Sequence, residues 1–219
     1  MSLPEPYYHR DGITIYCADC RDVLPHLPPV DLVLTDPPYG MKWDGKVTRG
    51  KSDPRAERKT SFFGQTIHGD DEPFDPSPFL FYPRVIMFGF NHFASRLPVG
   101  TTLVWIKRYD DGYGSFLSDA ELAWMKGGHG VYCKRDVSLQ GESSNRHHPT
   151  QKPLPLMRWC IEKAGGDGLI LDPFMGSGTT LRAAMDLGRK AIGIEIEERY
   201  CEIAVKRLQQ SVMRLEVPA

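Results

Sequence analysis

The chain contains a series of short, continuous apolar runs, and most of them end at an acidic residue or a turn. We expect strands at Ile13–Cys17, Asp31–Thr35, Val85–Phe88, Thr102–Ile106, Glu121–Met125, Leu169–Leu171 and Ala191–Ile194. Runs that lack polar alternation are typical of strands covered on both faces, as in a largely parallel sheet. The pattern therefore predicts a mostly parallel sheet between two layers of helices.

Helical periodicity is clearest near the C-terminus, where one stripe holds Cys201, Ala204, Val205, Leu208, Val212 and Leu215. A second helix is expected over Pro153–Ala164, with proline near its first turn and Gly165-Gly166 after its end. A third should begin near Gly178 and stop at Gly188. Strands that alternate with helices from Leu169 onward predict the α/β class.

Size and composition favour one globular domain over residues 1–219. Hydrophobic residues make up 41% of the 219 positions and charged residues 25%. The apolar runs fall short of the roughly 20 residues that a membrane span needs, and we expect no membrane association. Two long segments, 41–78 and 131–147, interrupt the pattern. The first is too long for a simple connection and is interpreted as a functional loop.

Basic residues are concentrated in 41–60, with seven bases against three acids, and in 126–152, with five against two, although the net charge is only −1. Such a distribution indicates a face that meets a polyanion, and two solvated loops are the alternative interpretation. The candidate nucleic-acid contacts are Lys42, Lys46, Arg49, Lys51, Arg55, Arg58, Lys59, Lys134, Arg135 and Arg146. If they neutralise phosphates, alanine at Lys51, Arg55, Arg58 and Lys59 should flatten the salt dependence of binding.

The five cysteines are widely spread, which favours a reducing compartment over a disulfide framework. Cys17 and Cys20 have the spacing of a zinc knuckle, but no second ligand pair follows at a usable distance. We therefore expect no metal site.

Four acidic residues stand at the carboxyl ends of expected strands: Asp19, Asp36, Asp172 and Glu195. In open α/β sheets this edge is the ligand crevice. Four carboxylates along one edge repel one another unless a ligand brings positive charge or hydroxyl donors. A nucleotide phosphate is a poor fit to that edge.

A glycine-rich turn follows the strand at Leu169, in the run Asp172-Pro173-Phe174-Met175-Gly176-Ser177-Gly178-Thr179-Thr180. Glycines let the backbone approach a ligand, and the next helix directs its N–H groups toward an anion such as a carboxylate. The run lacks the lysine of a phosphate-binding loop. Glu195, at the end of the following strand, is placed where an acid holds ribose hydroxyls.

The most specific motif is Asp36-Pro37-Pro38-Tyr39. Consecutive prolines impose a rigid turn after the aspartate and cannot continue a central strand. The turn offers a fixed carboxylate, carbonyl acceptors and an aromatic face, which together suit a planar amine.

These two motifs occur with a third, His148-Pro149-Thr150-Gln151-Lys152-Pro153, and in this order the three resemble the S-adenosylmethionine-dependent DNA amino-methyltransferases. The family modifies adenine N6 or cytosine N4, and the catalytic motif before the cofactor motif is its circularly permuted β-class order. The resemblance covers about Ile13 to Leu208. It implies a Rossmann-like, mostly parallel seven-stranded sheet with helices on both faces. The segment 131–147 would then be a short target-recognition region.

The resemblance also implies roles for individual residues. Asp36, Pro37, Pro38 and Tyr39 would be catalytic, with Tyr39 stacking on a base rotated out of the duplex. Residues implied to bind the cofactor S-adenosylmethionine are Asp19, Cys20, Asp36, Thr150, Gln151, Lys152, Asp172, Pro173, Phe174, Gly176, Ser177, Gly178, Thr179, Thr180 and Glu195.

Several alternatives stay open at this point. An aspartate at the start of the Asp36–Tyr39 motif favours adenine N6, and cytosine N4 is the alternative. A catalytically silent cofactor- and DNA-binding protein is a second class. A nicotinamide-dependent oxidoreductase is a third, although it leaves Asp36–Tyr39 unexplained. Carbon methylation of cytosine is disfavoured because no cysteine follows a proline.

The resemblance further implies a bacterial or phage-encoded enzyme that acts on double-stranded DNA in the cytoplasm. A homodimer and a separate cognate restriction enzyme are expected as possible partners. The permuted order makes a spatial prediction: the strands near Ile13 and Ala191 should be neighbours, and Tyr39 should face the same space as Gly176.

Overall fold

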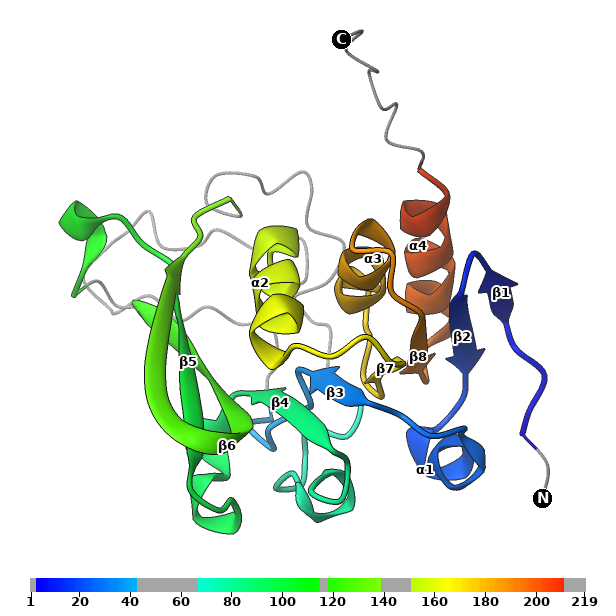
Figure 1. The fold of residues 1–219 in the computed structure, drawn as a ribbon, viewed down its shortest axis with the longest axis horizontal. Helices are drawn as coiled ribbons and strands as arrows, with labels where there is room; N and C mark the ends of the chain where they lie inside the picture. The colour runs from blue at the N-terminus through cyan, green and yellow to red at the C-terminus, as the bar shows by residue number, and fades with distance from the viewer. Residues whose placement is uncertain (1–2, 43–66, 115–117, 139–150, 211–219) are drawn as a thin grey trace, which may run out of the picture.

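The computed structural model describes residues 3–42, 67–114, 118–138 and 151–210 as one sheet covered by helices (Figure 1). The strands are β1 (Tyr8–Arg10), β2 (Ile13–Cys17), β3 (Leu32–Thr35), β4 (Arg84–Phe88), β5 (Gly100–Ile106), β6 (Ala120–Arg135), β7 (Ile170–Asp172) and β8 (Ala191–Glu195). Their order in the sheet is β1-β2-β8-β7-β3-β4-β6-β5. The α/β class and the largely parallel sheet are therefore confirmed.

Strands from opposite ends of the chain pair at the centre of the sheet. Ile13 of β2 is in register with Ala191 of β8, and the two strands run parallel. Leu32 of β3 pairs in parallel with Ile170 of β7. The pairing of β2 with β8 was predicted from the permuted motif order and is confirmed.

The sheet has eight strands among the described residues, so the expectation of seven was wrong. The additional strand is β1, which runs antiparallel to β2 at one edge. Its three residues are Tyr-His-Arg with mostly exposed side chains. Such a strand has no apolar run that would mark it in the sequence. It is extended because it pairs with β2.

The strand β6 extends ten residues beyond the expected Met125, to Arg135. Its first part pairs with β4 antiparallel, as in Ile86 with Met125. Its second part pairs in parallel with β5, as in Thr102 with Val131. Gly127 and Gly128 have positive φ and turn the strand between these two parts. The start of the 131–147 segment is thus strand.

Helices cover both faces of the sheet, as predicted. One face packs against α2 (Leu154–Ala164), α3 (Thr179–Asp186) and α4 (Glu198–Gln209), whose apolar side chains join one core cluster. The other face is covered by α1 (Cys20–Val23) and by short 3₁₀ turns that bury Phe79 and Phe93. Val212 and Leu215, expected on the last helix, lie outside the described residues.

None of the helices in the described ranges is long and apolar enough to cross a membrane.

Candidate active site

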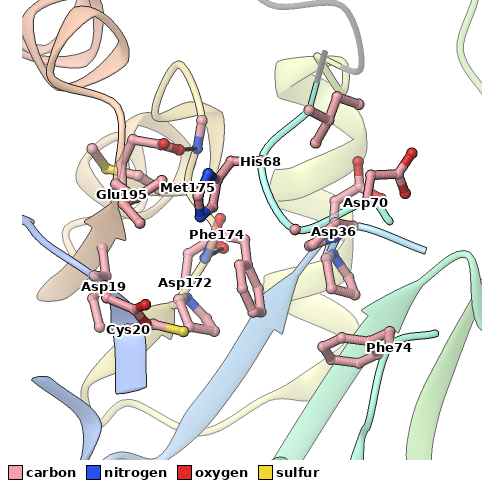
Figure 2. Close-up of a pocket in the computed structure, with 18 of the residues that line it drawn as sticks. Asp19, Cys20, Asp36, His68, Asp70, Phe74, Asp172, Phe174, Met175 and Glu195 are labelled. Carbon is pink, nitrogen blue, oxygen red and sulfur yellow. Dashed lines mark hydrogen bonds between the residues drawn. The ribbon is translucent and has the colours of Figure 1, made fainter. Parts of the chain in front are cut away.

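A pocket of about 1290 Å³ opens where β2, β3, β7 and β8 end (Figure 2). All four acids predicted at this edge line it: Asp19, Asp36, Asp172 and Glu195. Tyr39, which follows β3, and Gly176, which follows β7, line it as well. The two strands meet at this point, because the Thr35 hydroxyl of β3 donates to Asp172 of β7, 137 positions later in the chain. The predicted meeting of the proline turn and the glycine turn is confirmed.

Asp172 is buried and its carboxylate is held by three donors. It accepts hydrogen bonds from the hydroxyls of Thr35 at 2.8 Å and Thr180 at 2.5 Å, and from the Phe174 N–H at 3.2 Å. Burial raises the pKa of this carboxyl to about 6, against the lowering effect of the hydroxyls. Asp172 therefore ties β3, β7 and the start of α3 together.

Glu195 connects the end of β8 to the glycine turn. Its oxygens accept from the Gly176 N–H at 3.0 Å and from the Glu197 N–H at 2.9 Å. Burial raises the pKa of this carboxyl to about 7. The residue that was predicted to hold hydroxyls is thus placed at the pocket wall with a proton affinity well above that of a solvated glutamate.

Asp19 and Cys20 form the neighbouring wall. Asp19 caps α1 by accepting from the Arg21 N–H at 2.9 Å and also pairs with the Arg21 guanidinium. The Arg21 hydrogen bonds lower the pKa of Asp19. Burial raises the pKa of the Cys20 thiol to about 11, so this side chain is a neutral, weakly polar contact.

Arg207, which sequence reasoning did not predict as a site residue, holds the glycine turn through hydrogen bonds from α4. Arg207 of α4 donates to the Ser177 carbonyl at 2.5 Å, to its hydroxyl at 2.9 Å and to the Thr179 hydroxyl at 3.3 Å. Gly178 begins α3 with φ +76°, and a Cβ there would lie 2.8 Å from Ala204 Cβ. Gly178 therefore permits close packing of α3 on α4, whereas Gly176, Ser177, Thr179 and Thr180 line the pocket.

Asp36 follows β3 and points into the pocket with its side chain 15% exposed. One carboxylate oxygen accepts from the Tyr39 hydroxyl and the other from the Lys152 ammonium. Burial raises the pKa of Asp36, and the nearby ammonium opposes that rise. The carboxylate is thus oriented by two donors in a largely dry setting.

Lys152 bridges the Asp36 carboxylate and a second acid. Its ammonium, 6% exposed, lies 3.2 Å from Glu121 Oε2, and Lys107 donates to Glu121 Oε1 at 3.0 Å. Burial lowers the pKa of Lys152, but Asp36 and Glu121 together outweigh this and raise it. The structure therefore directs the Lys152 ammonium to Asp36. Sequence reasoning did not identify Glu121, because nothing in its local sequence marks it.

The Tyr39 ring lies on the turn that follows β4. It stacks on His92 with ring centroids 4.9 Å apart and planes 8° apart. A Cβ on Gly89 would lie 2.0 Å from Tyr39 Cε1, so the glycine backbone touches the ring. Gly89 and His92 were not predicted as site residues.

The segment 67–79 forms a further wall of the pocket and was expected to belong to a basic loop. Asp70 is buried and accepts from the N–H groups that follow the proline turn. Phe74 packs edge-on against Phe174, with centroids 5.9 Å apart, and both are visible in Figure 2. Acidic and aromatic side chains, rather than basic ones, thus face the pocket from this segment.

The predicted nucleic-acid contacts are only partly within the described residues. Lys46, Arg49, Lys51, Arg55, Arg58, Lys59 and Arg146 lie outside them, as does Thr150 of the predicted cofactor set. Arg135 pairs with Asp110 at 2.5 Å and donates to the Tyr113 hydroxyl at 3.0 Å. Lys134 is half-buried. Their role in DNA binding stays a prediction.

Within the described ranges, no cluster of three or more metal-ligating side chains comes together. Gln151 joins the pocket lining and lies 3.3 Å from the Ser177 hydroxyl.

Comparison with known proteins identifies relatives along most of the chain. A family model described as a DNA methylase matches residues 104–206. A protein of Escherichia coli (strain K12) named as a methylase, YubD, is 32% identical over 214 residues, covering 87% of each chain. The type II methyltransferase M.ScaI of Streptomyces caespitosus is 28% identical over an alignment that covers 98% of this chain and 87% of M.ScaI.

Solved structures share the fold. The M1.HpyAVI–SAM complex superposes with a TM-score of 0.55 and 23% identity, covering 90% of this chain and 100% of that one. The cytosine-N4-specific PvuII DNA methyltransferase gives a TM-score of 0.58 with 13% identity, covering 96% and 89%. With the identity to YubD and the pocket described above, these matches show that the chain belongs to the S-adenosylmethionine-dependent DNA amino-methyltransferases of the N6-adenine/N4-cytosine family.

Proposed function

We propose that the protein transfers a methyl group to the exocyclic N6 amine of adenine in double-stranded DNA. The observation that carries this proposal is that Asp36 and Tyr39 line the same pocket as Gly176 and Glu195. A target amine held by Asp36 and Tyr39 would then lie in the same cavity as the methyl donor. The aspartate at the start of the motif is what favours adenine N6 over cytosine N4.

The pocket residues fit S-adenosylmethionine by their chemistry. The ligand has ribose hydroxyls, a planar adenine, an ammonium and a sulfonium, and it supplies an electrophilic methyl group when bound. Glu195 and Asp19 offer carboxylates to hydroxyl donors and cationic groups. Phe174 offers an aromatic face to the adenine, and Cys20 a neutral contact. The acidic lining, unsuited to phosphates, agrees with this ligand.

Asp36 and the Pro37 carbonyl would accept the two hydrogens of the target amine. Conjugation with the ring drains the lone pair of such an amine, and two acceptors favour a pyramidal, nucleophilic nitrogen. Each carboxylate oxygen has two lone pairs, so Asp36 can accept from the amine while it keeps Lys152. Asp36 acts in this proposal as an orienting and electrostatic group rather than as a strong base.

Tyr39 would stack on the target base after the base leaves the duplex. Its hydroxyl bond to Asp36 and its contact with His92 fix the plane of the ring beside the carboxylate. A fixed ring lowers the entropy lost when the base arrives.

DNA affinity in this proposal comes from the basic residues of segment 41–60 and from Lys134, Arg135 and Arg146, through phosphate neutralisation. Action in the cytoplasm, a homodimer and a separate cognate restriction enzyme stay predictions.

The proposal is tested by incubating the protein with tritiated S-adenosylmethionine and unmethylated DNA and by identifying the labelled nucleoside after digestion. We expect N6-methyladenine, and loss of label with Asp36→Ala while calorimetry shows cofactor binding retained. Labelled N4-methylcytosine would replace the adenine assignment. Cofactor and DNA binding without any label would support the catalytically silent alternative and contradict the proposal.

A further inference from the structure

One carboxylate oxygen accepts hydrogen bonds from three consecutive backbone N–H groups at the end of the Asp36–Tyr39 turn. Asp70 Oδ1 accepts from the N–H groups of Tyr39 at 3.0 Å, Gly40 at 2.8 Å and Met41 at 3.1 Å. Asp70 is only 5% exposed, so these bonds are largely shielded from water. Consecutive amides that converge in this way form an anion-binding concavity, which the Asp70 carboxylate fills.

The backbone around Asp70 wraps the same turn. The Lys42 N–H donates to the Asp70 carbonyl at 2.8 Å. Gly40 has φ +81°, and a Cβ there would lie 2.5 Å from the Glu72 carbonyl oxygen and 2.9 Å from Pro73 Cα. The backbone from Asp70 to Pro73 is therefore in close contact with the turn from Tyr39 to Lys42.

These contacts fix the backbone of Tyr39 independently of its ring. The ring is placed by Asp36 and His92, and the amide by Asp70. Hydrogen bonds to an ionised acceptor are shorter and stronger than neutral ones. Three such bonds to a single Asp70 oxygen therefore fix the direction of the backbone that follows Tyr39.

We propose that Asp70 is a positioning residue for methyl transfer: its carboxylate holds the backbone of the Asp36–Tyr39 turn in the orientation that the target base requires. The proposal rests on the function proposed above and adds a residue from a different segment of the chain to the reaction. It concerns the rate of transfer and not the affinity for the cofactor, because the bonds of Asp70 go to the catalytic turn and those of Glu195 to the glycine turn.

The test compares the wild-type protein with Asp70→Ala, Asp70→Asn and Asp167→Ala. Asp167 is an exposed acid that does not line the pocket. Each variant is measured for kcat and KM in DNA methylation, for S-adenosylmethionine affinity by calorimetry, and for thermal unfolding. Asp70→Asn keeps an acceptor oxygen and removes the charge.

We expect Asp70→Ala to lower kcat by about 100-fold, as displacement of a catalytic group by about 1 Å does, with cofactor affinity nearly unchanged. Asp70→Asn should recover at least about a tenth of the wild-type kcat, because a neutral acceptor makes weaker but similarly directed bonds. Asp167→Ala should resemble the wild type. Equal kcat for wild type and a folded Asp70→Ala would overturn the proposal. Equal losses of cofactor affinity and kcat would also overturn it, in favour of a purely structural role. Absence of methylation by the wild type would instead refute the proposed function.

Discussion

The Lys152 ammonium donates to the Asp36 carboxylate, although 116 positions separate the two residues in the chain. The pair is buried and is extended by Glu121 and Lys107 to the outer part of the sheet. A buried carboxylate that loses its partner becomes costly to ionise. The charge of Asp36, and with it the electrostatic part of the proposed mechanism, therefore depends on Lys152.

We expect Lys152→Met to reduce kcat at pH 7 by about 100-fold, the cost of removing one preorganised charge from an active site. Burial already raises the pKa of Asp36, and loss of the ammonium removes the main opposing effect, so its pKa rises further. The acidic limb of the pH–rate profile should move to higher pH, with activity partly regained near pH 9.

The matched control is Lys190→Met, at an exposed position next to the start of β8 and away from the pocket. A Lys152→Met profile with unshifted limbs would contradict the dependence of Asp36 on this ammonium.

Glu195 predicts a pH dependence of cofactor affinity. Its pKa is raised to about 7, so the carboxyl is mostly protonated below neutral pH and mostly ionised above it. Hydroxyl donors bind the ionised form, and binding below pH 7 must therefore release a proton. The affinity for S-adenosylmethionine should be about tenfold lower at pH 6 than at pH 8.

Calorimetry in buffers of different ionisation enthalpy measures the proton release directly. Glu195→Gln should bind more weakly and lose most of the pH dependence between pH 6 and 8. If Glu195→Gln kept the full pH dependence of cofactor affinity, that dependence would belong to another group. Asp172 would be the first candidate, because its pKa is raised to about 6.

Gly89→Ala tests the support of the Tyr39 ring. Gly89 has φ +69°, and the added Cβ would overlap the ring at 2.0 Å, so the ring must move. We expect a loss of kcat of about 10- to 100-fold with cofactor affinity retained.

Gly188→Ala is the control, because Gly188 has φ +67° and nothing lies within 4 Å of its added Cβ. Both variants should lose about 1–2 kcal/mol of stability from the left-handed backbone, and only Gly89→Ala should lose activity. Similar kcat values for the two would show that the ring position does not matter.

Arg207→Met tests the support of the glycine turn. The guanidinium donates to Ser177 and Thr179, and both of those residues line the pocket. Without it we expect about tenfold weaker S-adenosylmethionine binding, since two or three hydrogen bonds that order the turn are lost. The kcat at saturating cofactor should change little.

Lys206→Met, one position earlier on α4 with a side chain 74% exposed, controls for changes in helix charge. A fall in kcat with unchanged cofactor affinity in Arg207→Met would show that this arginine acts on the catalytic turn instead.

The strands were predictable because most are fully buried and therefore apolar throughout. Six of the eight begin within two residues of their expected start and end within one residue of their expected end, and β2 coincides with its expected range. The strand β1 was not predictable, because an exposed Tyr-His-Arg edge carries no apolar pattern. The second part of β6 was missed because Gly127 and Gly128 interrupt the run at Met125.

Motif residues of the pocket were predictable because their chemistry is encoded in contiguous sequence, as in Asp36–Tyr39. Asp70, Glu121 and Arg207 were not, because each acts on the motif from a different element and stands in unremarkable local sequence. One sequence signal does exist for Asp70, since an acidic run within a basic segment is unusual. Its three amide partners follow only from the tertiary fold.

The position of β8 between β2 and β7 has a consequence for biosynthesis. Strand β2 is synthesised long before its parallel partner, residues 191–195, so the sheet stays incomplete between β2 and β7 until those residues have been translated. A ribosome that stalls before this point releases a chain without Glu195 and without the helix that carries Arg207. Such fragments would expose the apolar edges of β2 and β7, which makes them substrates for chaperones and proteases rather than partial enzymes.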